Sequence, residues 1–559
     1  MQQKTEPQLV TVLREGYRLK DFWSDLSAGL VVGIVAIPLA IAFAIASGVK
    51  PEQGLFTAII AGFLISAFSG SRVQIGGPTG AFIVIIYGII QKYGFDGLVV
   101  ATMIAGALLI VMGLLKLGAI IKFIPYPVTV GFTTGIAVII ATGQIRDVFG
   151  LTMESVPAEF IEKIAAYARD FGSFNPWAFA VFAASVVVIV LWPRVNKKIP
   201  GSIIAILLAT VLVQVFKLPV ETIQDRFGGI AGSFPMPRLP VVNREIISEM
   251  FFPGLTIAFL AGIESLLSAV VADGMLGTKH NSNMELIAQG IANLVTPIFG
   301  GIPATGAIAR TATNIKNGGR TPVAGIVHAV TILLVLALFS KWAALIPMST
   351  IAGVLIVVSY NMSEIRLFAR MFKNPKSDVL VMLTTFLLTV FIDLTVAIGV
   401  GIIMALFLFM KRMSEVTQMD YIGKMAHDMD GDNSKDPDEV DASAIPEGVE
   451  VFEVNGPFFF GAADKFKDTI SQIEKRPRIT IIRMRKVLSV DATALRALES
   501  IYYRTKREGT IFLLSGVHTQ PLFAMQKSGF IKLIGEDNMF ITLKEALERS
   551  RQELALITK

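Results

Sequence analysis

The sequence predicts a polytopic α-helical membrane protein of 14 transmembrane segments in two inverted repeats of seven, followed by a soluble α/β domain. Three observations lead to this prediction: an apolar composition, a series of apolar runs long enough to cross a bilayer, and an abrupt change to soluble patterning after residue 412. Of the 559 residues, 53% are hydrophobic and 17% are charged, and the mean hydropathy is +0.64. Most of such a chain prefers lipid to water, which excludes an ordinary soluble protein.

The composition also limits the chemistry. The chain has no cysteine and four scattered histidines, so we expect no disulfide framework, no metal site and no cofactor. The net charge of +6 comes with basic residues that lie mainly in loops beside apolar segments, which is a signal of membrane topology rather than of nucleic-acid binding. No small-residue cleavage site follows the first apolar run, so we expect no removable signal peptide.

Fourteen apolar runs are candidates for spans of roughly 20 residues each. Two of them, 78–91 and 304–315, are short and follow Gly/Pro-containing stretches, so we expect them to begin part-way through the membrane. The first set comprises 26–47, 51–69, 78–91, 97–115, 126–143, 174–192 and 200–216, and the second comprises 251–272, 284–299, 304–315, 321–340, 343–359, 377–393 and 395–410. The expected division is a cytoplasmic N-terminus (1–25), a first repeat (26–216), an extracytoplasmic connection (217–250), a second repeat (251–412), and a linker with the soluble domain (413–559).

The loop charges predict the orientation. Loops on the side of the N-terminus carry most of the basic residues, Arg72 and Lys373 among them, whereas the opposite loops carry fewer, such as Lys50 and Lys341. The positive-inside rule therefore places both termini in the cytoplasm of a multi-pass protein in the plasma membrane, which is the inner membrane in a bacterium.

The two sets also match in sequence. Thr79-Gly80-Ala81 recurs 226 positions later as Thr305-Gly306-Ala307, and Gly48 matches Gly274 at the same offset. A repeat with an odd number of spans inserts with opposite orientation, and inverted repeats with paired, interrupted segments are typical of secondary transporters.

A helix that begins at mid-membrane leaves its first N–H groups unpaired and points its positive dipole end into the bilayer. Two such ends that face each other would form a cradle for an anion. Thr79 and Thr305 could cap these helices or donate a hydroxyl group. The alternative is that the Gly/Pro stretches only kink two ordinary helices.

Four stretches resemble the SulP (sulfate permease) anion transporter family: Ala36–Phe43, Gly76–Phe82, Ile263–Ala269 and Asp273–His280. The resemblance implies seven plus seven inverted repeats divided into a mobile core domain, made of segments one to four and eight to eleven, and a gate domain. It also implies a homodimer, an elevator-like motion and a cytoplasmic STAS domain at the C-terminus. Carried over by position, the substrate-binding residues are Phe43, Thr79, Gly80, Thr305, Gly306, Ala307, Ala309 and Arg310.

Two positions differ from many eukaryotic sulfate carriers of this family. Leu39 replaces a frequent glutamine and Ala309 a frequent serine, while the stretch 263–310 looks most like bacterial members that carry dicarboxylates or bicarbonate. The resemblance thus implies a secondary active transporter of sulfate, bicarbonate or dicarboxylate, coupled to H⁺ or Na⁺, and not an enzyme. The alternatives are an anion exchanger or channel, a carrier like the nucleobase permeases, and a membrane-tethered sensor.

Two charged residues lie within apolar segments. Arg310 comes five residues after Thr305, about 7.5 Å along a helix, where it could serve the anion, reach the headgroups or pair with Glu264. Glu264 lies in the apolar run 257–267 and must be neutralised by a proton, a bound cation or Arg310. The resemblance places this segment beside the anion cradle, so we expect Glu264 to couple transport to an ion, with Ser268 as a further oxygen ligand. Protons are favoured slightly over Na⁺, because no dense cluster of oxygen side chains surrounds the position.

The segment 428–447 is acidic and poor in apolar residues, as expected of a linker. Beyond it, strands are predicted at 449–454, 479–484 and 511–514, and helices at 463–474, 492–506, 519–527 and 542–555. The stretch Val487–Leu495 resembles the strand-to-helix turn of STAS domains, in which Thr493 stands at the position of a phosphorylated serine. The alternative is structural: Asp491 caps the following helix. A STAS domain also implies a cytoplasmic partner protein.

Overall fold

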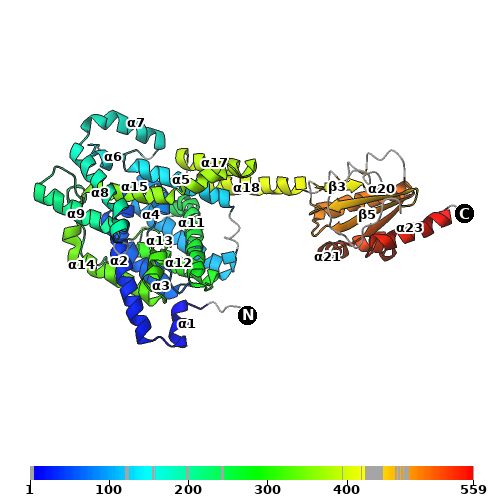
Figure 1. Ribbon diagram of the computed structural model, residues 1–559, viewed down its shortest axis with the longest axis horizontal. Coiled ribbons are helices and arrows are strands. Elements are labelled where there is room, and N and C mark those ends of the chain that lie inside the picture. Colours follow the sequence, from blue (N-terminus) through cyan, green and yellow to red (C-terminus); the bar gives the residue numbers. More distant parts are fainter. Residues whose placement is uncertain are drawn as a thin grey trace. The chain divides into compact units, whose positions relative to one another are not determined.

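The structure is a computed structural model that describes residues 6–557, except 120–124, 154–155, 158, 197–199, 239, 241–243, 393, 417, 422–444, 460–461, 464–465, 467–469 and 471–476. The chain forms two compact units, Met1–Ala405 and Leu406–Lys559 (Figure 1). The predicted division into a helical membrane part and a soluble α/β part is confirmed.

Helices of the first unit follow the predicted spans closely. In the first set they are α2 (Leu19–Ala46), α3 (Pro51–Phe68), α4 (Ile83–Leu114), α5 (Tyr126–Gly143), α8 (Pro176–Val195) and α9 (Gly201–Phe216). The short helix α1 (Gln8–Glu15) precedes them. Helix α4 contains two of the predicted segments, and Gly94 separates its two arms because its backbone has φ 67° and ψ −169°, a conformation that only glycine adopts readily.

The second set consists of α11 (Arg244–Leu276), α12 (Ser282–Val295), α13 (Ile308–Lys316), α14 (Val323–Ala343), α15 (Met348–Met362), α17 (Lys376–Phe391) and α18 (Leu394–Val416). Among the described residues, nine helices of the chain are long and apolar enough to cross a bilayer by themselves. The others, such as the nine-residue α13, are shorter and depend on their neighbours.

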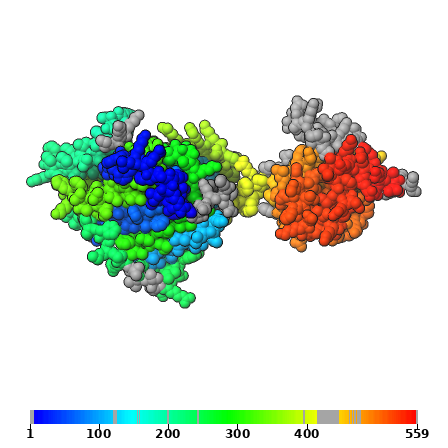
Figure 2. All heavy atoms as spheres, turned by 90° about the horizontal axis from the view of Figure 1, so that it is seen from below, coloured from blue at the N-terminus to red at the C-terminus, as the bar shows by residue number. Residues whose placement is uncertain are grey.

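In each set, one helix packs against the first two helices of the other set. Helix α14 packs against α2 and α3, and α4 packs in the same way against α11 and α12, so that the two sets interleave in Figure 1 and share one face of the unit in Figure 2. Glycines permit the close approach: a Cβ atom on Gly29 would lie 2.5 Å from the Ala324 carbonyl oxygen, and one on Gly254 would lie 2.9 Å from that of Ala101. Such exchanged contacts are what two related sets of helices would produce.

Three short helices lie between the spans, where the sequence analysis placed no element: α6 (Ile145–Phe149), α7 (Phe160–Asp170) and α10 (Ile223–Phe227). Helix α16 (Ile365–Met371) similarly connects α15 and α17. Helices α6, α7 and α10 carry charged side chains and line one end of the helical unit near the C-terminal end of α5, whereas α16 packs near Val130 in the N-terminal half of α5.

The second unit contains a five-stranded sheet in the order β3 (Gln418–Tyr421), β4 (Val449–Asn455), β5 (Ile479–Lys486), β6 (Ile511–Ser515) and β7 (Met539–Phe540). Only the β3–β4 pair is antiparallel. The helices are α20 (Ala492–Arg507), α21 (Thr519–Ser528), α22 (Phe530–Ile534) and α23 (Leu543–Ile557). The three predicted strands and three of the predicted helices are confirmed, whereas most of the predicted helix 463–474 and of the acidic linker 428–447 lies outside the described residues.

The sheet is covered on both faces. Phe452 and Ile482 pack with α20 residues such as Leu498, while Val451 and Ile481 contribute to a separate core with α23. This alternation is typical of strands whose successive side chains point to opposite faces.

Asp491 caps the N-terminus of α20, which is the structural alternative considered for this turn. One Asp491 carboxylate oxygen accepts a hydrogen bond of 2.8 Å from the Ala494 backbone N–H, so Asp491 caps the helix. Thr493 is exposed in the first turn of α20.

Candidate functional site

The two interrupted segments meet at the centre of the helical unit. Gly76–Gly77 (β1) and Thr305–Gly306 (β2) form a short antiparallel pair, with Gly76 opposite Gly306 and Gly77 opposite Thr305. Each strand leads directly into a helical start: β1 into the 3₁₀ turn Gly80–Phe82 and α4, and β2 into α13. The alternative of two merely kinked helices is wrong, because the backbone of each segment is extended at β1 or β2 before its helix begins.

Side chains of neighbouring helices, most of them from the opposite set, hold the loops before these strands. The Ile75 N–H donates to the Thr311 hydroxyl oxygen (3.1 Å), and the Asn314 amide donates to the Val73 carbonyl (2.9 Å). On the other side, the Ala304 N–H donates to the Asn293 side chain (2.9 Å) and the Ile302 N–H to the Thr57 hydroxyl (2.7 Å). Residues of the other half of the chain therefore hold Val73, Ile75 and Ile302, whereas Ala304 is held by Asn293 of its own half.

Arg310 lies against the paired strands β1 and β2, whose meeting point is called the crossing. Its side chain is 2% exposed, its Nη2 donates to the Pro78 carbonyl oxygen (2.9 Å), and its Nη1 is buried without a hydrogen-bond partner among the described residues. A Cβ atom on Gly77 would lie 2.1 Å from Nη1, so glycine is required for this contact. Arg310 and Glu264 form no ion pair, since Glu264 accepts from Thr79 and Arg310 donates to Pro78, and the burial of Arg310 against β1 does not fit the reading in which it reaches the headgroups.

Glu264 lies directly beside the first helical start. The Thr79 hydroxyl group donates to Glu264 Oε2 at 2.9 Å, and both residues are partly exposed. Thr79 therefore makes no capping bond to its own helix and instead links the carboxylate of α11 to the start of the α4 segment. A carboxylate in the middle of an apolar helix is costly unless it is paired, hydrogen-bonded or protonated.

Two hydroxyl groups from the sequence prediction are engaged elsewhere. Thr305 is fully buried, and its hydroxyl donates to the Ala261 carbonyl of α11 at 2.7 Å, so the expectation that this group caps α13 is wrong. Its contact with a substrate stays a prediction. The Ser268 hydroxyl donates to that of Thr311 at 3.2 Å, in the packing between α11 and α13.

The remaining predicted residues surround the two helical starts. A Cβ atom on Gly80 would lie 3.5 Å from the Phe43 ring and 3.3 Å from the sulfur of Met362 in α15. The Ala307 N–H is already used, because it donates to the Ile75 carbonyl, whereas the first turn of α13 at Ala309 is exposed. N–H groups in the first turn of a helix have no intrahelical partner, so those from Ala309 and Arg310 are the donors that a ligand could reach.

A buried polar network behind the crossing was missed by the sequence analysis. The fully buried Glu285 accepts hydrogen bonds from Ser265 (2.9 Å), Gln289 (2.8 Å) and the Gly70 N–H (3.1 Å), and Ser265 in turn accepts one from Gln74 (2.8 Å). Its sequence signal is a polar stripe at intervals of four residues along α12, at 285, 289 and 293.

Comparison with known proteins gives consistent matches for both units. Residues 22–385 match the model of the sulfate permease family and residues 442–546 that of the STAS domain. The chain is 42% identical over 529 residues to the "Putative sulfate transporter YvdB" of Bacillus subtilis, covering 94% of this chain and 97% of the relative. It is 30% identical over 540 residues to the bicarbonate transporter BicA of Picosynechococcus, covering 94% of each. The solved structure of SLC26A9 has the same fold, with a TM-score of 0.86 at 17% identity over 99% of this chain and 93% of that chain.

Proposed function

This chain belongs to the sulfate permease family and carries a STAS domain, and from that premise we propose that it is a secondary active transporter of a small anion, either sulfate, bicarbonate or a dicarboxylate. The observation that carries the proposal is Arg310, a buried cation with an unpartnered Nη1 at the point where two helices begin. A buried positive charge without a carboxylate partner is costly, and a bound anion would compensate it. The free N–H groups and the positive dipole end of α13 act in the same direction.

The charges of the site favour a monovalent anion. Arg310 contributes one positive charge, and Glu264 cancels it when ionised but not when protonated. A proton on Glu264 together with bicarbonate would leave the site neutral, whereas sulfate would leave one uncompensated negative charge. Bicarbonate is therefore the first candidate, in agreement with the relative BicA, and sulfate is the second, in agreement with the name of the relative YvdB.

The contact between Thr79 and Glu264 offers a mechanism of coupling. An ionised Glu264 accepts the Thr79 hydroxyl proton in a hydrogen bond. A protonated Glu264 would instead donate to the Thr79 oxygen, and the Thr79 hydroxyl would then be free to donate to the anion. Coupling to H⁺ is favoured over Na⁺ because the hydroxyl groups of Thr305 and Ser268 are engaged elsewhere and the described residues contain no cluster of acidic or histidine side chains.

The rest of the predicted architecture is part of the same proposal. Helices α2–α4 and α11–α14 surround the crossing and would form the moving core of an elevator-like mechanism, while α5 packs against both α15 and α17, and these three helices would belong to the gate. We further propose a homodimer in the plasma membrane with both termini in the cytoplasm, where the STAS domain would meet a partner protein. Thr493 remains a candidate site of phosphorylation, supported by its exposure.

Counterflow of labelled anions into liposomes that contain the purified protein tests the proposal. We expect bicarbonate to exchange and to accumulate under an imposed proton gradient. A folded protein that moves no anion would support the sensor, unitary currents would support a channel, and counterflow of a nucleobase would support the alternative carrier. Each of these three outcomes would refute secondary anion transport.

A further inference from the structure

A cavity of about 710 Å³ lies at the end of the helical unit that α6, α7 and α10 cover. Its wall includes none of the predicted site residues, but it comes close to them: Ile140 lines the cavity and also lies 3.5 Å from the Cβ position of Gly80. Ile83, which begins α4 directly after the 3₁₀ turn, lines it as well. Two isoleucine side chains thus form an apolar barrier between this cavity and the candidate site. The exposed Gln91 and Glu159 lie at its rim, so the cavity opens to the surface.

Lys163 of α7 supplies an uncompensated positive charge in this cavity. Its side chain is 5% exposed, it forms no ion pair with any described residue, and its Nζ lies 5.3 Å from the centre of the Tyr87 ring. Burial lowers the pKa of the Lys163 amine. The Tyr87 hydroxyl group donates to the Val156 carbonyl oxygen and so offers Lys163 no negative charge. A buried ammonium group with only an aromatic ring beside it is incompletely compensated.

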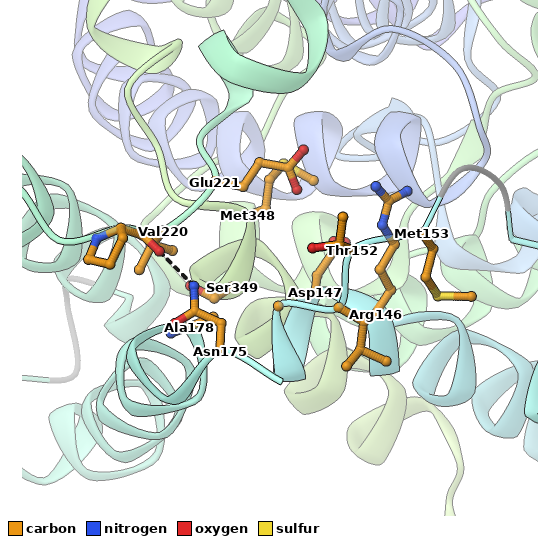
Figure 3. A pocket seen from close by; sticks show the side chains of 13 residues that line it. Arg146, Asp147, Thr152, Met153, Asn175, Ala178, Val220, Glu221, Met348 and Ser349 are labelled. Atoms are coloured by element: carbon orange, nitrogen blue, oxygen red, sulfur yellow. Dashed lines mark hydrogen bonds between the residues drawn. The ribbon is translucent and has the colours of Figure 1, made fainter. Parts of the chain in front are cut away.

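Arg146 adds a second positive charge. Its Nε is buried without a partner, and its neighbour Asp147 is committed to Arg226, which also binds Glu221. Arg146 and Asp147 line both the large cavity and an adjoining one of about 290 Å³, where Figure 3 shows them next to each other on α6. Of the three cations around the large cavity, Arg226 therefore has carboxylate partners, whereas Lys163 and Arg146 have none among the described residues.

We propose that this cavity is a second anion site, in which Lys163 and Arg146 hold a small inorganic oxyanion before it passes the barrier of Ile83 and Ile140. The proposal rests on the proposed transport function for the identity of the anion, which would be the transported one. The cavity has room for the anion with part of its hydration shell. Two cations at the entrance would raise the local anion concentration and the rate of loading from this side. In the orientation proposed above, this is the extracytoplasmic side.

Lys163→Met tests the site, and Lys92→Met is its matched control. Lys92 also lies over a tyrosine ring, with its Nζ 4.9 Å from the centre of Tyr93, but it is exposed and lines neither described cavity. With labelled bicarbonate or sulfate supplied from the cavity side, we expect Lys163→Met to raise the half-saturating concentration about tenfold and to change the maximal rate less than twofold, since one charge is lost. The value measured from the opposite side and the values of Lys92→Met should be unchanged, and Lys163→Arg should retain the wild-type affinity.

An equal change of the half-saturating concentration on both sides would overturn the second site. A loss of maximal rate at unchanged affinity would also overturn it, because a purely structural contact between α7 and Tyr87 would produce that result. A binding measurement separates this test from transport. Sulfate should protect Lys163, but not Lys92, from modification by pyridoxal phosphate, as read by mass spectrometry. If the protein moves no anion but Lys163 is protected, the proposed function fails and the second site stands. If Lys163 and Lys92 react alike with and without sulfate, the second site is refuted.

Discussion

Replacing Arg310 by methionine removes the positive charge beneath the β1–β2 crossing while keeping a side chain of comparable length. The expected loss of anion affinity can be estimated from the charge alone. At a separation of about 5 Å and an effective dielectric constant of about 20, the attraction between a guanidinium group and a monovalent anion is about 3 kcal/mol, which corresponds to a loss of affinity of roughly 100-fold.

The same replacement should change stability much less. It leaves the Pro78 carbonyl without its hydrogen bond, which costs about 1–3 kcal/mol. It also removes the buried and unpartnered Nη1, which offsets part of that cost. We therefore expect a protein that folds and is purified in normal yield.

Binding of bicarbonate and sulfate to the purified protein by calorimetry, together with counterflow in liposomes, measures the effect. Arg310→Lys should fall between the wild type and Arg310→Met, since it keeps the charge but loses the planar group. Arg320→Met is the control, because Arg320 also donates to backbone carbonyls, at Ile315 and Gly319, but is exposed and follows α13. Wild-type affinity in a folded Arg310→Met protein would refute the role of this charge in anion binding.

Four further predictions follow from the same structure. Glu264→Gln should still bind and exchange the anion but lose accumulation driven by a pH gradient, and unchanged accumulation would remove Glu264 from the coupling. Deletion of residues 430–559 should reduce the amount of transporter at the membrane or its rate more than the order of preference among anions, as a competition assay would show; an altered order would contradict this. Asp491→Ala should lower the stability of the STAS unit by about 1 kcal/mol in denaturant unfolding, because the cap of α20 is lost, while Thr493→Ala should change it by less than about 0.5 kcal/mol. Burial lowers the pKa of Lys163 in the folded protein below its value in the unfolded chain, so between these two values the unfolded chain binds more protons and the stability of the folded protein rises with pH. Lys163→Met should therefore flatten the rise of the thermal unfolding temperature with pH just below pH 10.5. An unchanged slope would contradict the burial of a charged Lys163.

The positions of the helices were accessible from the sequence because the requirement to cross a bilayer acts locally. A run of roughly 20 apolar residues identifies a span wherever it lies, and the glycines and prolines in the stretches 76–78 and 300–303 identify the interrupted segments. The sequence predicted a gap between the segments 78–91 and 97–115, but not that one helix with a break at Gly94 would join them. The residues before and after such a break are equally apolar whether the helix is continuous or kinked.

The directions of single side chains were not accessible in this way. Thr305 turns toward the Ala261 carbonyl, and Thr79 toward Glu264, because of how α11 lies against the two strands, which depends on contacts between residues 44 and 185 positions apart. Lys163 was overlooked for a related reason. It occurs in a short amphipathic helix of ordinary composition, and only the folded chain places it over Tyr87 without an ion pair to a described residue.

The hydrogen bonds that hold each extended segment from the other half of the chain also affect synthesis. Ile75 and its partner Thr311 are 236 positions apart, and at about 5–20 residues per second a ribosome needs roughly 10–50 s to cover that distance. During this interval the Ile75 N–H and the Val73 carbonyl lack their native partners, and a buried backbone group without a partner costs about 1–3 kcal/mol. The first half of the nascent chain must therefore remain hydrated or shielded at the insertion machinery until residue 314 arrives. A chain truncated before that point would keep these groups unpaired, and quality-control proteases could recognise it by them.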